Sequence, residues 1–595
     1  MTAVPTAPDQ DRPHRRTHAE QRPATIVNPV LPGFHPDPSI LRVGDDYYIA
    51  TSTFEWLPGV VVHHSRDLVN WRSLGGILRE ERTVDLTGRP DSGGVWAPCL
   101  SYTEGLFHLV YSDVTNLSGA FKDVRNFVIT APAIDGPWSD PAPFPSHGFD
   151  PSLFHDDGPE GDERSWALWM EWDHRTGHHP FAGILLQEWD RERRQVTGPL
   201  HRVFDGTPLA HTEGPHLYRT GDWYYLVTAE GGTSWAHAVT VARSRTLTGP
   251  YEADPDGPLL TSAGHETWPL QKAGHGSLVE TPAGEWYLAH LMARPLTPMG
   301  PCVLGRETAL QRIEWNAGGW PRLAGTPVSE PTGAHASEPA GAHASEPASP
   351  QAGGHLPRTA VPGPALPPAP VPAVPALDHF DGPELTTPWA TLRRHPDPSW
   401  LDLTERPGHL RLRGGQSLGS THGQSLVARR QQAMSFDFSS RLEAEPRSPL
   451  QMAGIVHYYN STLWHYLHLT WDEDLGRVLR VGLCDHGRYL EPEPAVAVPD
   501  GPLDLLLTVR TTRAHFAWRS AHGSPWRTIG PDLDVTRLSD ESATQGDPAT
   551  GHFTSWGFTG AFAGLCVQDL TGAALAADFA WSEYRETVSG RHEER

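Results

Sequence analysis

Residues 38–52 read PSILRVGDDYYIATS, two short apolar runs joined by a Gly-Asp turn. This pattern predicts a β-hairpin, because a central Gly-Asp favours the tight turns that join antiparallel strands. Four similar runs follow, EGLFHLVY at 104–111, ERSWALWM at 163–170, GDWYYLVT at 221–228 and GEWYLAHL at 284–291. One hairpin-forming unit is therefore repeated five times in the first three hundred residues.

A second short sequence motif precedes each run and gives the period of the repeat. It is marked by Pro38, Pro98, Pro151, Pro215 and Gly276, so the steps are 60, 53, 64 and 61 residues. Units of this length with several strand-like runs indicate a radial β array with one four-stranded blade per unit. Five units predict a five-bladed β-propeller catalytic domain at residues 28–325.

The residues next to these markers carry the functional argument. In a propeller the first strand of each blade lines the central channel, so the markers and their neighbours should converge there. The residues concerned are Asp37, Trp96, Asp150, Glu213 and His275. A single Asp-Pro or Glu-Gly is more often a turn element. Here three of the five corresponding positions of the repeat hold acids, and the other two positions hold Trp and His. This pattern favours a functional centre.

Three carboxylates around one narrow channel cannot all ionise at their ordinary pKa values, because like charges raise one another's pKa. Such a group separates into one acid and one base near neutral pH, the pair that glycoside hydrolysis requires. Trp96, with Phe54 and Trp56 downstream of the first hairpin, offers an apolar wall for a sugar ring. His275 fits three roles equally: a substrate contact, a ligand of an axial cation, or a hydrogen-bonded plug.

Composition excludes several classes of partner. A net charge of −24 argues against nucleic acid and anionic membranes, and no apolar run approaches membrane-spanning length. The four cysteines lack CxxC spacing, which favours free thiols in a reducing compartment. The N-terminus has no apolar core of a secretory signal, so we expect a cytoplasmic protein.

Changes in composition divide the chain further. Residues 1–27 are polar and predict a disordered tail, and residues 326–377 are rich in Pro, Ala, Gly and Ser, which is typical of a linker. Long alternating runs resume at residues 378–587 and predict a β-sandwich of the jelly-roll or concanavalin type; a short tail, 588–595, follows. The expected fold class is all-β.

Several long motifs resemble glycoside hydrolase family 43, the β-xylosidase and α-L-arabinofuranosidase group. They are NPVLPGFHPDPSI, SGGVWAPCLSY, GFDPSLFHDD, HTEGPHLY, QKAGHGSLVE and VLGRETALQR in the repeat region, and GFTGAFAGLCVQDL in the C-terminal region. The chain is most similar to the two-domain β-xylosidases with a C-terminal β-sandwich. The resemblance covers about residues 28–322 and 378–586.

The resemblance implies an inverting reaction that needs no cofactor, and it assigns roles to residues of this chain. Asp37 would be the general base, Glu213 the general acid, and Asp150 the residue that tunes the pKa and position of the acid. Arg306 would contact sugar hydroxyls, and Phe558 would lie on an aromatic loop that closes one side of the pocket. Phe54, Trp96 and Ala97 would shape the first sugar subsite.

Metal binding and assembly are left more open by the resemblance. His275 resembles an axial histidine that in several family members binds calcium through water. A structural calcium site in the sandwich, with Asp381 or Asp578, is a further expectation. His35 stands where many relatives have Asn, and we expect it to modify the surroundings of Asp37. Homo-oligomerisation fits such enzymes, but the sequence shows no interface signal.

The predicted function is an exo-glycosidase that releases xylose from the non-reducing end of β-1,4-xylo-oligosaccharides. The nearest alternative is an α-L-arabinofuranosidase, or a bifunctional enzyme, on the same scaffold. An alternative of another class is a non-catalytic carbohydrate-binding propeller, which has no need of three axial acids. A retaining fructosidase is less favoured. The second of the three acids in such enzymes lies in an Arg-Asp-Pro motif, whereas this chain has Phe149-Asp150-Pro151.

Overall fold

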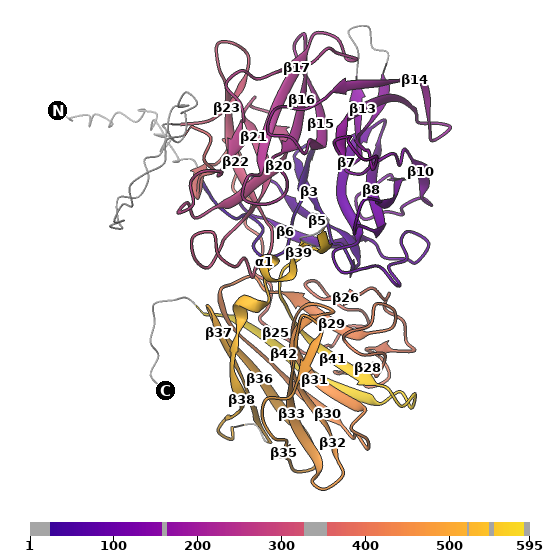
Figure 1. The fold of residues 1–595 in the computed structure, drawn as a ribbon, viewed down its shortest axis with the longest axis vertical. Coiled ribbons are helices and arrows are strands. Elements are labelled where there is room, and N and C mark those ends of the chain that lie inside the picture. The colour runs from indigo at the N-terminus through magenta and orange to yellow at the C-terminus, as the bar shows by residue number, and fades with distance from the viewer. Residues whose placement is uncertain (1–23, 157–162, 326–353, 521–522, 547–552, 588–595) are drawn as a thin grey trace, which may run out of the picture.

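The computed structural model describes residues 24–156, 163–325, 354–520, 523–546 and 553–587. It consists almost entirely of β-strands, arranged as a propeller followed by a sandwich (Figure 1). Among the described residues no helix is long and apolar enough to cross a membrane.

The propeller has five antiparallel blades, and in each the first four strands follow one another in chain order from the axis outward. Blades 1 and 2 contain β2 (Ser39–Val43), β3 (Asp46–Thr51), β5 (Gly59–Ser65), β6 (Arg72–Leu78), and β7 (Gly94–Thr103), β8 (Leu106–Asn116), β9 (Asp123–Ala131), β10 (Ala142–Phe144). Blade 3 contains β11 (Ser152–Asp156), β12 (Arg164–Trp172), β13 (Phe181–Asp190) and β14 (Gln195–Phe204). The five repeats of the sequence are thus five blades.

The last two blades complete the ring. Blade 4 contains β15 (Glu213–Thr220), β16 (Trp223–Glu230), β17 (Ala238–Ser244), β18 (Glu252–Ala253) and β19 (Leu260–Thr261). Blade 5 contains β20 (Gln271–Glu280), β21 (Trp286–Ala293), β22 (Glu307–Trp315) and β23 (Pro321–Leu323). The first strands contact one another in the cyclic order β2, β7, β11, β15, β20 and back to β2. Ring closure therefore brings the starts of all five blades to one axis.

The junction of the first and last blades has a hydrogen-bonded link. The Ser277 hydroxyl donates to the carbonyl of Pro38 at 2.8 Å and accepts from the amide of Ile40 at 2.9 Å. A small separate sheet lies nearby, in which β1 (Thr25–Val27) pairs with β24 (Ala360–Pro362). These two strands fall in segments that the sequence analysis placed in the N-terminal tail and the linker. Both are ordered because Ile26 and Val361 are buried in a shared core with blades 1 and 5.

The C-terminal domain is a two-sheet sandwich. One sheet has the order β27 (Leu401–Asp402), β28 (Leu410–Arg413), β42 (Ala576–Glu586), β30 (Ser435–Ala444), β36 (Leu503–Arg510), β37 (Arg513–Arg519), β38 (Arg527–Asp534), with β25 (Leu377–Asp378) on β42. The other has β34 (Arg488–Leu490), β33 (Gly476–Asp485), β32 (Leu463–Asp472), β31 (Gln451–Asn460), β41 (Phe562–Asp569), β29 (Ser425–Arg430) and β26 (Ala390–Leu392), with β35 (Val496–Ala497) on β33. Alternating side chains of both sheets fill the space between them, as the sequence pattern predicts.

The two domains share a sheet and a core. The short strand β4 (Trp56–Leu57) leaves blade 1 and pairs with β26, so it forms the edge of the second sandwich sheet. The Trp56 ring stacks on Phe562 of β41 with centroids 3.8 Å apart. One segment of the sandwich lies against the propeller. It contains η1 (Val535–Arg537), α1 (Asp540–Ala543), β39 (Gln545–Gly546) and β40 (Phe553–Ser555). Figure 1 shows α1 and β39 at the junction of the two domains.

Candidate active site

A repeated backbone conformation shapes the channel end of every blade. The residue just before each marker has a positive φ: Asp37 (54°), Ala97 (30°), Asp150 (53°), Gly214 (57°) and His275 (44°). Four of the five are not glycine, and the left-handed conformation costs a non-glycine residue about 1–2 kcal/mol. Strain of this kind, repeated at the axis, is typical of functional sites.

The same backbone turn interrupts strand pairing. The register of the first strand shifts between Trp96 and Cys99 in blade 2 and between Glu213 and His216 in blade 4. Such bulges re-aim side chains at the rim of a sheet. Trp96 and Glu213 lie one residue before the left-handed position, so the five predicted residues are not strictly equivalent. The sequence repeat predicted their convergence but not this offset.

Asp37 has three polar neighbours in a buried setting. Its side chain accepts a hydrogen bond of 2.6 Å from the Ser52 hydroxyl at Oδ2, and it is only 6% exposed. Its Oδ1 lies 3.7 Å from Arg306 Nη1 and 3.5 Å from His275 Nδ1. Ser52 is itself fixed, because its hydroxyl accepts from the amide of Ala97 at 2.7 Å. Blade 2 thus holds the carboxylate of blade 1 in one orientation.

Asp150 and Glu213 form a coupled pair beside Asp37. The amide of Gly214 donates to Asp150 Oδ2 at 3.1 Å, which connects blade 4 to blade 3. Burial, and then the charge of Asp37, raises the pKa of Asp150. Burial, and then the charges of Asp150 and Asp37, raises the pKa of Glu213 well above its usual value. Glu213 is partly open to solvent, so its proton can reach a bound molecule.

Aromatic rings from both domains surround the acids. Phe558 lies 5.8 Å from Phe54 and 5.8 Å from Trp96, measured between ring centroids. Phe54 and Trp96 are 6.0 Å apart and both are buried. The sandwich therefore contributes an aromatic side chain to the wall of the propeller channel, where the resemblance placed Phe558. Such a wall suits the apolar face of a pyranose ring.

Gly94 allows its own backbone segment to approach the backbone of Phe54 closely. It has a φ of 81°, and a Cβ built on it would lie 2.4 Å from the carbonyl oxygen of Phe54. Phe54 and Val95 form a bridge at this point. A larger residue at position 94 would push Phe54 out of the aromatic wall.

Arg306 contacts both Asp37 and the aromatic wall. Its Nη1 donates to the Thr233 hydroxyl at 2.9 Å, and its Nε and Nη2 donate to the carbonyl of Phe558 at 3.3 and 3.1 Å. The guanidinium also lies 4.7 Å from the centroid of the Phe558 ring. These contacts give Arg306 a role in holding Phe558 in place. The contact with sugar hydroxyls that the resemblance implies stays a prediction.

His275 lies beside Asp37 in a cluster of imidazoles. Burial lowers its pKa, and His216 and His237 are its electrostatic neighbours. Among the described residues no group of three or more His, Cys, Asp or Glu side chains is arranged to hold a metal. Calcium prefers oxygen ligands, and this cluster offers neutral imidazoles with one carboxylate. Direct coordination does not fit, and a calcium ion held through water stays a prediction.

The structure also gives the surroundings of His35 and Asp578. The ring of His35 packs edge-on against His63 at 4.6 Å and lines the cavity between the two domains. Its influence on Asp37 stays a prediction. Asp578 of the sandwich forms ion pairs of 2.7 and 2.8 Å with Arg411 and Arg406. A structural calcium site in the sandwich, with Asp381 or Asp578, stays a prediction.

Reasoning from the sequence missed two lysines, Lys122 beside Glu213 and Lys272 at the junction of the domains. Lys122 is an electrostatic neighbour of Glu213, and its Nζ lies 4.7 Å from the Trp172 ring and 5.7 Å from the Trp556 ring. Burial lowers its pKa to about 8. Lys272 lies 5.0 Å from the Trp235 ring and is buried. The sequence feature that could have pointed to them is the rarity of lysine, since these are the only two lysines in 595 residues.

Two protein-family models match this chain, one over the propeller and one over the sandwich. Residues 26–321 match the model of glycosyl hydrolases family 43, and residues 377–585 match that of the beta xylosidase C-terminal concanavalin A-like domain. A crystal structure of a xylan beta-1,4-xylosidase from Bacillus halodurans superposes with a TM-score of 0.86 at 47% identity, covering 94% of this chain and 100% of that one.

Curated relatives are similar over nearly their whole length. A xylan 1,3-beta-xylosidase of a Vibrio species is 42% identical over 94% of this chain and 99% of its own. A xylosidase/arabinosidase, 43B, of Humicola insolens is 42% identical over 94% of this chain and 97% of its own. These similarities span both domains and the junction between them.

Proposed function

Because this chain belongs to glycosyl hydrolases family 43, a glycoside hydrolase family, we propose that it is an inverting exo-β-xylosidase. The substrate is a short β-1,4-xylo-oligosaccharide, cut at its non-reducing end to release xylose. The observation that carries the proposal is the group of three axial acids, in which Asp150 and Glu213 have raised pKa values and Asp37 is oriented by Ser52. No cofactor takes part in this chemistry.

The proposed reaction uses one acid and one base. The protonated carboxyl of Glu213 gives its proton to the glycosidic oxygen as the bond from that oxygen to the anomeric carbon breaks. Asp37 removes a proton from a water molecule, whose oxygen attacks the anomeric carbon from the opposite face. Inversion needs room for this water, with the two carboxyls ~6.5–9.5 Å apart. Burial, and then the charges of Asp150 and Asp37, raises the pKa of Glu213 and so favours its protonated form.

Exo action is supported by the aromatic wall. Phe558 of the sandwich packs beside Phe54 and Trp96 of the propeller, and Arg306 of the propeller contacts both its ring and its backbone. A site closed on one side accepts the end of a chain rather than its middle. The β-1,4 linkage is proposed from the similarity to the Bacillus halodurans enzyme, and a β-1,3 linkage is the alternative that the Vibrio relative supports.

Proton NMR of the first-formed sugar tests the reaction directly. With xylobiose as substrate, we expect α-xylose to appear first, before mutarotation produces the β-anomer. Initial release of β-xylose would contradict inversion, and an absence of hydrolysis by a folded protein that binds xylobiose would support the carbohydrate-binding alternative. Asp37→Ala serves as the inactive control, with an expected loss of roughly 10²–10⁴-fold in rate.

The α-L-arabinofuranosidase alternative is tested with paired aryl glycosides. The Humicola insolens relative carries both activities in its name, and the two sugars present similar oxygens. We expect a higher kcat/KM for the aryl β-D-xylopyranoside than for the aryl α-L-arabinofuranoside. A clear preference for the arabinofuranoside would replace the first proposal by the second.

A further inference from the structure

Ser92 is a buried residue at the junction of the two domains. It lies in the loop between β6 and β7, and only 1% of it is exposed. Its φ of 61° lies in the left-handed region, where a residue other than glycine is strained. Its amide, carbonyl and hydroxyl all form hydrogen bonds, and their partners come from three segments of the chain. A strained residue whose polar groups are all engaged is a candidate for a functional role.

The hydroxyl of Ser92 binds the segment of the sandwich that carries Phe558. It donates to the carbonyl of Trp556 at 3.0 Å and accepts from the amide of Phe558 at 3.1 Å. The ring of Trp556 also packs on that of Phe558, with centroids 4.9 Å apart. One side chain of the propeller therefore anchors the backbone of the sandwich segment on both sides of Gly557.

The carbonyl of Ser92 holds the other ring of the pair. It accepts a hydrogen bond of 2.9 Å from the indole Nε1 of Trp96, which restricts rotation of that side chain. The rings of Trp96 and Phe558 meet edge to face, with centroids 5.8 Å apart and planes at 81°. Ser92 is thus bonded to both members of this pair, one from each domain.

The backbone of Ser92 is itself fixed by its surroundings. Glu55, which is fully buried, accepts from the amide of Ser92 at 3.1 Å through Oε2. Asp91, the preceding residue, pairs with Arg393 of the sandwich at 2.6 Å. The amide of Arg393 in turn donates to the carbonyl of Glu55 at 2.9 Å. Contacts with both domains therefore hold Ser92 in its strained conformation.

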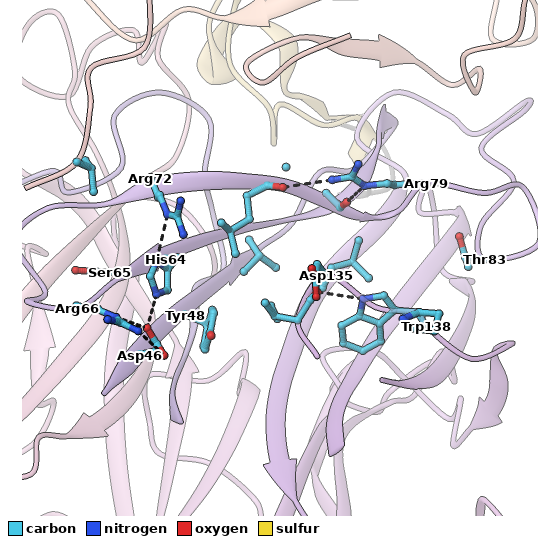
Figure 2. Close-up of a pocket in the computed structure, with 18 of the residues that line it drawn as sticks. Asp46, Tyr48, His64, Ser65, Arg66, Arg72, Arg79, Thr83, Asp135 and Trp138 are labelled. Carbon is cyan, nitrogen blue, oxygen red and sulfur yellow. Dashed lines mark hydrogen bonds and ion pairs between the residues drawn. The ribbon is translucent and has the colours of Figure 1, made fainter. Parts of the chain in front are cut away.

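Ser65 is a comparable serine of the propeller whose bonds are all local. It is also 1% exposed, and its hydroxyl donates to the carboxylate of Asp67 at 3.1 Å. The same hydroxyl accepts from the amides of Asp67 and Leu68 at 3.1 and 2.9 Å. Figure 2 shows Ser65 in the wall of a cavity on blade 1, at the end of β5, the third strand from the axis. A buried serine hydroxyl is therefore not in itself a link between the domains.

We propose that Ser92 is a positioning residue that sets the spacing of Phe558 and Trp96, and thereby the affinity for the terminal xylose unit. This role rests on the proposed function, in which the two rings border that sugar. A gap of about 0.5–1 Å between ring and sugar removes roughly a quarter to a half of the dispersion energy of each contact. The rings contact the sugar alike in the ground state and the transition state, so Ser92 acts on binding and not on the proton transfers.

Ser92→Gly isolates the hydroxyl. Glycine adopts a positive φ without strain, and the amide and carbonyl bonds of residue 92 are kept. With xylobiose as substrate we expect KM to rise about 5–30-fold at an unchanged kcat, because two hydrogen bonds to the Phe558 segment are lost. Ser92→Cys, which is similar in size and keeps a weak donor and acceptor, should give an intermediate KM.

Inhibition by D-xylose separates positioning from a purely structural role. Xylose, as the released product, occupies the same subsite, so its competitive inhibition constant should rise by the same factor as KM. A substitution that only destabilised the fold would reduce the amount of active protein, which lowers the apparent kcat and leaves both constants unchanged. Ser65→Ala is the matched control and should keep the wild-type KM and inhibition constant.

A double-mutant cycle with Phe558→Ala tests the route of the effect. If the hydroxyl acts through Phe558, adding Ser92→Gly to Phe558→Ala should raise KM by less than about twofold. The full increase in that background, or unchanged constants in folded Ser92→Gly and Ser92→Cys proteins, overturns the proposal. Wild-type protein that neither hydrolyses xylobiose nor binds xylose would refute the proposed function, and this role of Ser92 with it.

Discussion

Among single residues, Ser52 has the most direct influence on the proposed base. It donates to Asp37 and accepts from the amide of Ala97, so it joins the carboxylate of one blade to the backbone of the next. The sequence offers no sign of this role, since Ser52 is one polar residue within TSTFEWLPG. Only the closure of the ring brings Ala97 against it.

We expect Ser52→Ala to lower kcat about 10–100-fold with little change in KM, because a hydrogen bond to a charged group is worth about 1.5–3 kcal/mol. Steady-state kinetics on xylobiose measures the loss. Ser39→Ala is the matched control: its hydroxyl also accepts from a blade 2 amide, that of Leu100 at 3.0 Å, but it does not touch Asp37. An equal loss of kcat in both variants would contradict a positioning role for Ser52.

The pH dependence of kcat/KM should report the charges around Glu213. A general acid acts while protonated, so activity falls as the pH rises through its pKa. Asp150 raises the pKa of Glu213 and Lys122 lowers it. Asp150→Asn should therefore move the basic limb of the profile to lower pH, and Lys122→Met should move it to higher pH. Shifts in the same direction in the two variants would rule out this electrostatic assignment.

Among the elements, α1 is small but joins the domains through a buried ion pair. Lys272 of β20 lies 2.5 Å from Glu541 and 3.3 Å from Asp540, both on α1. Glu541 also accepts from the amide of Cys302 at 2.7 Å, and Asp540 accepts from the hydroxyl of Tyr459 at 2.8 Å. The loop that carries Phe558 follows this helix, so the same contacts support the aromatic wall.

Lys272→Met should lower the free energy of unfolding by about 3–5 kcal/mol, because it leaves two carboxylates without their buried partner. Chemical denaturation followed by tryptophan fluorescence measures this change. A rise in KM should accompany it, since the Phe558 loop loses support. Arg245→Met removes the exposed pair with Asp222 and should change stability by no more than about 1 kcal/mol. Similar effects in the two variants would show that α1 is not a structural clamp.

Considered as a whole, the molecule depends on the docking of its two domains. The edge strand β4 belongs to the propeller in sequence but to the sandwich sheet in hydrogen bonding. One hydrophobic core contains Phe34, Phe54 and Trp56 from blade 1 together with Tyr458 and Phe562 from the sandwich. Removal of either domain would expose this core to water.

A chain that ends at residue 376 should therefore be poorly soluble and should hydrolyse xylobiose at least 100-fold more slowly than the full chain. The reasons are the exposure of the Trp56 surface and the loss of Phe558. Soluble yield and initial rates measure the two effects. Mixing with separately produced residues 377–595 should restore part of the activity. A soluble truncated propeller with unchanged kcat/KM would refute the need for the sandwich.

Much of this protein could be predicted from local patterns. The five-fold repeat predicted a closed propeller, alternation predicted the sandwich, and the phase of the repeat selected Asp37, Asp150 and Glu213. All four cysteines are free and buried, as their spacing suggested. These features were readable because strand periodicity and turn chemistry are properties of neighbouring residues. The cytoplasmic location stays a prediction.

What depended on the tertiary structure is every contact between segments distant in the chain. Examples are the pairing of β1 with β24 and of β4 with β26, the bridge from Ser52 to Ala97, and the place of Lys122 beside Glu213. A sequence pattern records which side chains will be buried, but it does not record which partners burial brings them. Those partners are set by how the blades close and how the sandwich docks, and they determine the charge and orientation of each group.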